Sequence, residues 1–178
     1  MKKLPMVTIG RHKTGKKLKA ALVKAGVGCI VPWVDLLLEN SLTLSPEPQQ
    51  IQLVAVDLLT DLGLTDECQF EDIIEAGKKK NLVECQLEDI FEARLDYLDQ
   101  PMDEYLIAAM EPQGCYVGSP GLPKVEEEFE ILLTLECLDK KPWIRTRRKG
   151  IDVVNKGLKN CWNPEHDPAF RKIIFRQS

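Results

Sequence analysis

Apolar and polar positions alternate along this chain with two periods, one typical of helices and the other of strands. Residues 16–24 repeat apolar side chains at helical spacing, and Thr14 and Gly26 stand where an N-cap and a helix-ending glycine belong. Residues 129–137 instead place an apolar side chain at every second position, which predicts a strand. The two periods together predict a chain that mixes helices with strands.

The same reasoning gives the remaining elements. Further helices are predicted over residues 33–39, from residue 65 or 66 to residue 79, and over 86–94. Further strands are predicted over residues 6–9, 51–59, 105–110, 143–146, 151–154 and 169–175. Residues 82–85 are predicted as a short strand or a link, and residues 95–98 as an extended segment. For residues 51–59 a helix is the rival interpretation, because a short apolar run fits both periods. Residues 114–123 are rich in Gly and Pro, which predicts a loop.

The predicted helices come early in the chain and the strands late. This order favours an α+β fold, with an N-terminal helical part packed on a strand-rich, mainly antiparallel C-terminal part. The Ser-Pro-Glu-Pro run at residues 45–48 interrupts the regular pattern and marks a possible boundary. We therefore expect a helical N-terminal segment over residues 1–45 and an α+β domain over 46–178, with one compact domain over 1–178 as the alternative.

A chain of 178 residues is long enough to bury a substantial core. No run approaches the roughly 18 apolar residues that a membrane span needs, so we expect no membrane association. Lys2 and Lys3 resemble the start of a signal peptide, but lysines at 13, 16, 17 and 19 interrupt any apolar stretch that would follow. We expect a cytoplasmic protein whose six cysteines remain reduced thiols. Because these cysteines are spaced too widely for a local zinc site, neither a metal nor another cofactor is expected.

The net charge of −4 conceals three segments of opposite sign. Residues 1–34 carry eight Lys/Arg and no acid, residues 35–139 carry 25 acids and five bases, and residues 140–178 carry eleven bases and three acids. Two basic ends that meet on the surface would form a nucleic-acid patch. We favour the other interpretation, in which the basic ends fold against the acidic middle and neutralise it, because a nucleic-acid site usually comes with a basic domain.

The segment from Gly10 to Lys17 nearly forms a phosphate-binding loop. Gly15 and Lys16 complete a G-x-x-x-x-G-K pattern, but Lys17 stands where Ser or Thr would ligate Mg²⁺. In a phosphate-binding interpretation, Lys16 would contact the β- and γ-phosphates, and Asp57, at the end of an apolar run, would hold the metal. The competing interpretation is a basic first helix that is capped at its start.

Two other groups of residues have possible catalytic chemistry. Cys115, in a glycine-rich segment, would need His12 or His166 as a base to act as a nucleophile, and a buried, inert thiol is the simpler interpretation. Paired carboxylates can do acid–base work, although a solvated rim is the commoner role for such residues. Four carboxylates surround the apolar run at residues 105–110: Asp99, Asp103, Glu104 and Glu111.

The run LDYLDQPMDEYLIAAMEP at residues 95–112 resembles a family of uncharacterised bacterial proteins. Residues 61–85, the helix start at Thr14, and the Trp-Asn-Pro at 162–164 with residues 170–175 are similar to the same family. The resemblance implies no established activity, cofactor or catalytic residue. It directs attention to the polar positions of its most specific run as a binding surface.

We expect a non-catalytic binding or interaction module for a protein or a small ligand, with Gln100, Glu104 and Glu111 as candidate ligand-binding residues. This expectation rests on the absence of metal-ligand spacing, of an intact nucleotide motif and of more than two histidines. The first alternative is a hydrolase or transferase that acts on a phosphate-containing substrate, through Lys16 with Asp57 or through the carboxylates of Glu104 and Glu111. The second alternative is nucleic-acid binding through the basic termini.

Overall fold

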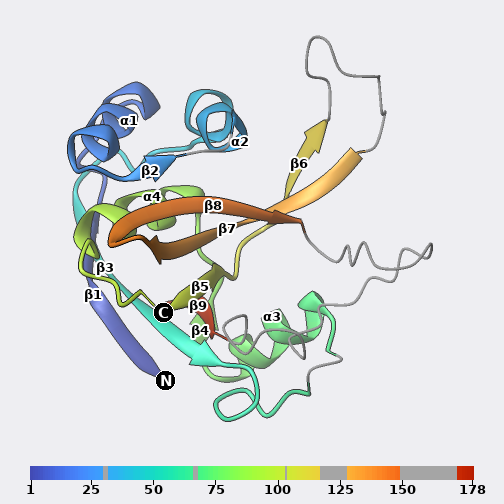
Figure 1. Ribbon diagram of the computed structural model, residues 1–178. Coiled ribbons are helices and arrows are strands. Elements are labelled where there is room, and N and C mark those ends of the chain that lie inside the picture. Colours follow the sequence, from blue (N-terminus) through green and yellow to red (C-terminus); the bar gives the residue numbers. More distant parts are fainter. Residues whose placement is uncertain (30–31, 66–67, 103, 117–127, 149–171) are drawn as a thin grey trace.

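The computed structural model describes residues 1–29, 32–65, 68–102, 104–116, 128–148 and 172–178, which form a curled sheet with helices around and inside it (Figure 1). Its strands are β1 (Lys2–Ile9), β2 (Gly28–Cys29), β3 (Gln49–Asp57), β4 (Leu82–Val83), β5 (Tyr105–Ala108), β6 (Gln113–Tyr116), β7 (Glu128–Leu138), β8 (Lys141–Arg148) and β9 (Lys172–Gln177). Its helices are α1 (Gly15–Lys24), α2 (Pro32–Leu36), α3 (Phe70–Lys79) and α4 (Leu87–Asp96), together with the π-helical turn η1 (Leu37–Ser41). None of these helices is long and apolar enough to cross a lipid bilayer.

The strands of the described residues pair in one mixed sheet, in the order β1-β3-β9-β5-β7-β8-β2, with β4 also on β9 and β6 also on β7. Most neighbours are antiparallel, whereas β5 runs parallel to β9 and β2 parallel to β8. This mixture of helices and strands agrees with the α+β class. The expected division into a helical N-terminal part and a strand-rich C-terminal part is not confirmed, because β1 and β3 belong to the same sheet as the C-terminal strand β9.

Helix α4 lies inside the curl of the sheet, where it contacts β1, β7, β8 and α1 (Figure 1). Its residues from Leu87 to Arg94 are all buried, and these include the charged side chains of Glu88, Asp89 and Glu92. A charge that is buried without a partner costs several kcal/mol. The core of this fold therefore has to supply hydrogen bonds and ion pairs to α4 from other parts of the chain.

Most of the predicted elements are confirmed. Strands β1, β3, β5, β7, β8 and β9 overlap the predicted strands, and α1 and α4 overlap predicted helices. Thr14 caps α1, with its Oγ1 accepting a hydrogen bond from the Lys17 amide at 3.2 Å. Gly26 follows α1 with φ of +75°, as expected for a residue that ends a helix. The strand predicted over 151–154 lies outside the described residues.

Several of the predicted boundaries are wrong, and three of them have a local physical explanation. Helix α3 begins at Phe70 rather than after residue 65 or 66, because Gln69 and Asp72 form a capping box in which the Gln69 amide donates to Asp72 Oδ2 at 2.8 Å. Residues 95–96, expected to be extended, complete the last turn of α4. Residues 114–116, expected in a loop, form part of β6, because β7 extends far enough to pair with them.

Candidate functional site

The near phosphate-binding loop is occupied by one of the protein's own carboxylates. The amide of Gly10 donates to Glu88 Oε1 at 2.9 Å. The amide and the hydroxyl of Ser45 donate to Glu88 Oε2 at 2.8 and 2.7 Å. Gly10 has φ of +75°, and a Cβ at this position would collide with the carbonyl oxygen of Glu47. A tight turn and an internal anion therefore explain the glycine with which the phosphate pattern begins.

Three carboxylates, spaced four residues apart on α4, bind the segment that follows β1. Glu92 accepts a hydrogen bond from Arg11 Nε at 2.7 Å and lies 2.7 Å from His12 Nδ1. Asp96 accepts from Arg11 Nη2, also at 2.7 Å. With Glu88 they form a row along one face of α4, because side chains at i and i+4 are neighbours. Burial opposes the charge of Arg11, but its hydrogen bonds to Asp96 and Glu92 raise its pKa above the ordinary value.

The remaining residues of the predicted phosphate site do not converge. Lys16 is exposed in the first turn of α1, and a Cβ on Gly15 beside it would collide with the backbone of η1. Gly10 packs against Glu47 near the start of β3, whereas Asp57 is the last residue of that strand. At about 3.3 Å per residue, the ends of this strand lie roughly 25 Å apart. Asp57 Oδ1 accepts two backbone amides of the turn after β3, at 3.0 and 2.9 Å.

Gln100 and Glu104 lie together in the interior. Gln100 is 3% exposed; its Oε1 accepts from Arg94 Nη1 at 2.5 Å and its Nε2 donates to the Glu104 carbonyl oxygen at 2.9 Å. The Glu104 carboxylate accepts from Tyr97 OH at 2.5 Å and from Lys2 Nζ at 2.6 Å. These two predicted binding residues therefore use their polar atoms to tie α4 and β1 to the segment before β5.

The Arg94 guanidinium is the most deeply buried charge of this network. Burial lowers the pKa of Arg94 to about 10. Its Nη1 also donates to the carbonyl oxygen of Glu136 at 3.3 Å, and its Cζ lies 5.8 Å from the centre of the Tyr97 ring. Among the described residues, Nε and Nη2 of Arg94 have no hydrogen-bond partner. Arg94 is thus positively charged at neutral pH, and among the described residues only Nη1 of its guanidinium makes hydrogen bonds.

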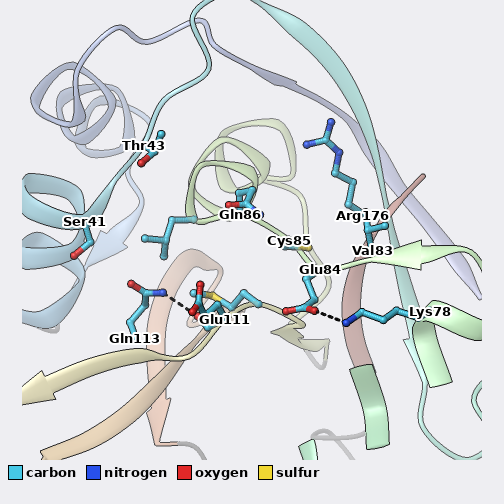
Figure 2. Close-up of a pocket in the computed structure, with 12 residues that line it drawn as sticks. Ser41, Thr43, Lys78, Val83, Glu84, Cys85, Gln86, Glu111, Gln113 and Arg176 are labelled. Atoms are coloured by element: carbon cyan, nitrogen blue, oxygen red, sulfur yellow. Dashed lines mark hydrogen bonds and ion pairs between the residues drawn. The ribbon is translucent and has the colours of Figure 1, made fainter. Parts of the chain in front are cut away.

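Glu111, the third predicted binding residue, lies beyond the other end of β5 and lines a pocket of about 630 Å³ (Figure 2). Cys85, Leu87 and Met110 give the pocket a buried, largely apolar part. The rest of the lining is mostly polar and includes Thr43, Lys78, Glu84, Gln86, Gln113 and Arg176. A volume of several hundred cubic ångströms with an apolar part and a few polar groups is typical of small-molecule sites.

The pocket forms where the carboxyl ends of β4 and β5 meet on the same edge of β9. Strand β4 pairs with residues 176–177 of β9, and β5 pairs with residues 173–174. The Cys85 amide donates to the Ala109 carbonyl oxygen at 2.7 Å and holds the two segments together. Beyond this contact, the segment after β4 enters α4 and the segment after β5 leads to β6. Crevices at which chain segments diverge from the ends of strands are common ligand sites.

The pocket contains both signs of charge. Lys78 Nζ pairs with Glu84 Oε1 at 3.2 Å. Arg176 Nη1 lies 3.7 Å from Asp89 Oδ1, which is beyond hydrogen-bond distance. Asp89 Oδ1 has no hydrogen-bond partner among the described residues, and burial raises the pKa of Asp89. Among the described residues no donor of the 29% exposed Arg176 side chain makes a hydrogen bond, so donors remain there for a ligand.

The described part of the chain gives no support to a metal site or to a cysteine nucleophile with a histidine base. There, no group of three or more His, Cys, Asp or Glu side chains is arranged to hold a metal ion. Asp103 and His166 lie outside the described residues, so the predicted pairing of Cys115 with His166 is not tested. His12, the other candidate base, contacts Glu92, and Asp99 is exposed.

Sequence reasoning predicts Glu111 as a binding residue but does not predict the other polar groups that line the pocket. Gln86 follows β4 closely, Glu111 follows β5, and Arg176 lies near the end of β9. A polar residue just beyond a short apolar run was the available signal in all three places. The sequence contains no sign that these three ends meet, because the pairings span up to 95 residues.

The basic ends of the chain pair with its acidic middle. Ion pairs join Lys2 and Lys172 to Glu104, Arg11 to Glu92 and Asp96, Lys19 to Asp35, Arg145 to Glu136, and Arg176 to Asp89. Each of these bases comes from residues 1–34 or 140–178, and each acid from residues 35–139. The interpretation that the ends neutralise the middle is confirmed for these pairs.

Comparisons of the chain with protein-family models, with curated proteins and with solved structures find no match. The resemblance of residues 95–112 to a family of uncharacterised bacterial proteins therefore stays a prediction. The function of this protein has to be inferred from its own geometry, and the pocket beside Glu111 is the feature that bears on it most directly.

Proposed function

We propose that this protein is a non-catalytic binding module and that its ligand is a small polar molecule held in the pocket between Glu111 and Arg176. The observation that carries the proposal is the pocket itself. Its volume of about 630 Å³ falls within the range of small-molecule sites, and it combines an apolar part with charged and amide groups. We also retain the proposals of a cytoplasmic location and of a boundary between residues 1–45 and 46–178, with one compact domain over 1–178 as the alternative.

The chemistry of the lining favours binding over catalysis. Burial and the nearby charge of Asp89 raise the pKa of Cys85 well above its ordinary value, so the sulfur is a neutral thiol rather than a nucleophilic thiolate. This thiol donates to the Ile174 carbonyl oxygen at 3.5 Å. Glu84 is engaged by Lys78, and the lining formed by the described residues contains no histidine that would act as a base.

A hydrolase or transferase for phosphate-containing substrates is the alternative, and the geometry gives it less support. Gly10 lies near the start of β3 and Asp57 at its end, Lys16 is exposed on α1, and Glu104 and Glu111 lie beyond opposite ends of β5. Nucleic-acid binding is the other alternative. The ion pairs that bring acids to both basic ends weaken the positive potential that such binding needs.

The proposal is tested by a thermal-shift screen of polar small molecules against the protein and two variants. Thr43→Trp fills the pocket from an exposed position, and Thr65→Trp adds the same ring at an exposed position that does not line it. A ligand at about a hundredfold its Kd adds roughly 2.7 kcal/mol to the free energy of unfolding. For a chain of this size that raises Tm by about 5–10 °C. We expect this shift in the unmodified protein and in Thr65→Trp, but not in Thr43→Trp.

Two results would contradict the proposal. One is a screen at millimolar concentration in which no polar molecule raises Tm. The other is a ligand that stabilises Thr43→Trp as much as the unmodified protein, because its site is then elsewhere. ATP with Mg²⁺ belongs in the same screen. A shift with ATP that survives Thr43→Trp and disappears in Lys16→Ala would favour the phosphate-binding alternative.

A further inference from the structure

The charges that the pocket leaves unused define the chemistry of its ligand, an inference that rests on the binding function proposed above. We propose that the ligand is a zwitterion with a carboxylate at one end and a primary ammonium group at the other. A short peptide has this chemistry, because its ammonium and carboxylate groups are separated along the chain, whereas a free α-amino acid carries both on one carbon. Arg176 would hold the carboxylate, and Glu111 would hold the ammonium group.

Arg176 is placed to act as the carboxylate anchor. Its strand is paired on both sides, with Leu53 of β3 and Val83 of β4 opposite Arg176 itself, so its backbone is fixed. The ion pair with Asp89 at 3.7 Å orients the guanidinium but uses none of its donors in a hydrogen bond. A guanidinium with free donors binds a carboxylate through two parallel hydrogen bonds, which makes this pairing both strong and directional.

The first turn of α4 adds a second favourable group for the carboxylate. Gln86 and Leu87 both line the pocket at the start of this helix. The capping box between Gln86 and Asp89 satisfies the amides of those two residues. The Leu87 amide, in contrast, has no acceptor within the helix. A carboxylate near Arg176 would therefore also meet the positive end of the α4 dipole.

Glu111 is the carboxylate that remains for an ammonium group. The other carboxylate of the lining, Glu84, already pairs with Lys78 at 3.2 Å. The side chain of Glu111 is exposed and has no ion-pair partner among the described residues. Its backbone is held by the Gln113 side-chain amide, which donates to the Glu111 carbonyl oxygen at 2.9 Å. Figure 2 shows Arg176 and Glu111 on opposite sides of the pocket, as the two ends of a zwitterion require.

The charge balance separates a zwitterion from a simple anion. Lys78 and Arg176 balance Glu84 and Glu111 in the lining, and Asp89 lies behind Arg176. A phosphate or dicarboxylate would bring excess negative charge against these acids, whereas a zwitterion adds none. The pocket is also larger than the two charged groups need. Its buried part at Leu87 and Met110 suits an apolar side chain of the ligand.

The test uses isothermal titration of the full chain with leucine, methionine and the dipeptide Ala-Leu, each beside its N-acetyl and its C-terminal amide derivative. We expect the dipeptide to bind in the pocket, and to bind more tightly than either free amino acid. Because each charged end makes charge-assisted hydrogen bonds, removing the charge of either end should weaken binding about tenfold or more. Binding by the free amino acids alone would contradict the inference, because one carbon cannot present its two charged groups to opposite sides of the pocket.

Variants assign the two ends of the ligand. Glu111→Gln should weaken the parent probe and abolish the difference between it and its N-acetyl derivative. Arg176→Gln should abolish the difference between the parent probe and its amide. Because Arg176→Gln leaves the buried Asp89 without its counter-charge, Arg176→Lys serves as a second variant that keeps the charge and loses the paired hydrogen bonds. Glu75→Gln and Lys79→Gln, at exposed positions of α3, are controls that should bind like the unmodified protein.

Two outcomes would overturn the inference. In the first, the parent probes bind no better than their N-acetyl and amide derivatives, or bind equally well to Glu111→Gln and Arg176→Lys. In the second, the dipeptide does not bind, while other polar molecules stabilise the protein and lose their effect in Thr43→Trp. In that second case the pocket binds small polar ligands and only the zwitterion is excluded, so the two proposals fail separately.

Discussion

The contacts of Glu88 favour a capped first helix over a phosphate-binding loop near the start of the chain. The Glu88 carboxylate accepts hydrogen bonds from the Gly10 amide at 2.9 Å and from both donors of Ser45. The first amide of the loop is therefore bound to an internal anion. The glycine pattern is visible in the sequence, but its partner lies 78 residues further along the chain. Local pattern therefore predicted a loop that begins at a glycine and could not predict the group that it binds.

Gly10 is predicted to tolerate substitution much less well than Gly26, although both have φ of +75°. A Cβ at Gly10 would meet the Glu47 carbonyl oxygen, whereas nothing lies within 4 Å of a Cβ at Gly26. Gly26→Ala should lower the free energy of unfolding by about 1 kcal/mol, from the backbone conformation alone. Gly10→Ala should lower it by about 3 kcal/mol or more, because steric overlap is added. Urea unfolding measures both, and equal losses would show that Glu47 does not pack against Gly10.

Asp89 and Asp61 are predicted to change stability with pH in opposite directions. Burial raises the pKa of Asp89, so its favourable contribution is complete at low pH and is lost as pH rises through that raised pKa. Burial opposes the charge of Asp61, but the Asp57 amide and the N-terminal ammonium group lower its pKa, so its contribution is lost as pH falls. Asp89→Asn should therefore gain stability relative to the unmodified protein as pH rises from about 3.5 to 7, and Asp61→Asn should lose it.

Urea unfolding at a series of pH values measures the two differences. The Asn side chain at position 89 can still accept the Gln86 amide, so the helix cap is retained. Asp61→Asn is the matched control, because the same chemical change is made at a carboxylate with the opposite shift in pKa. Two differences that change in the same direction with pH would contradict the environments assigned to both carboxylates.

Helix α4 shows why an element can be predicted while its surroundings are not. Its apolar positions are spaced for a helix, and Gln86 with Asp89 forms the capping box that starts it. Carboxylates at 88, 92 and 96 look like the solvated face of a surface helix. They are instead directed to the segment after β1 and to Ser45, because the sheet curls around α4. The burial of these carboxylates depends on strand pairings between distant segments, which the helical spacing of apolar residues does not predict.

The pocket likewise comes from the ends of elements rather than from any one of them. Strands β4 and β5 were predicted as short apolar runs, and their carboxyl ends converge on β9. The polar residues just beyond these runs, Gln86 and Glu111, become neighbours of Arg176. Gln100 and Glu104 come from the same run as Glu111 and are directed into the core, because β5 separates them from the pocket.

The whole chain is organised by opposite charges at long range. Basic residues of both termini pair with carboxylates of the middle segment, and one of these acids, Glu104, receives two cationic groups, from Lys2 and Lys172. Segment charges counted from the sequence predicted this complementarity without predicting a single pair. The class of fold was likewise predicted, whereas the placement of β9 between β3 and β5 was not, because strand order depends on contacts between distant segments.

The pocket is tested most directly by amide NMR spectra of the full chain, titrated with the strongest ligand from the thermal-shift screen. If the ligand binds where we propose, the largest shifts will come from the amides of Gln86, Leu87 and Gln113, while the Gly10 amide, bound to Glu88, stays unchanged. Shifts centred instead on Gly10 and Lys16, or small shifts with no common centre, would contradict a binding module whose ligand lies between Glu111 and Arg176.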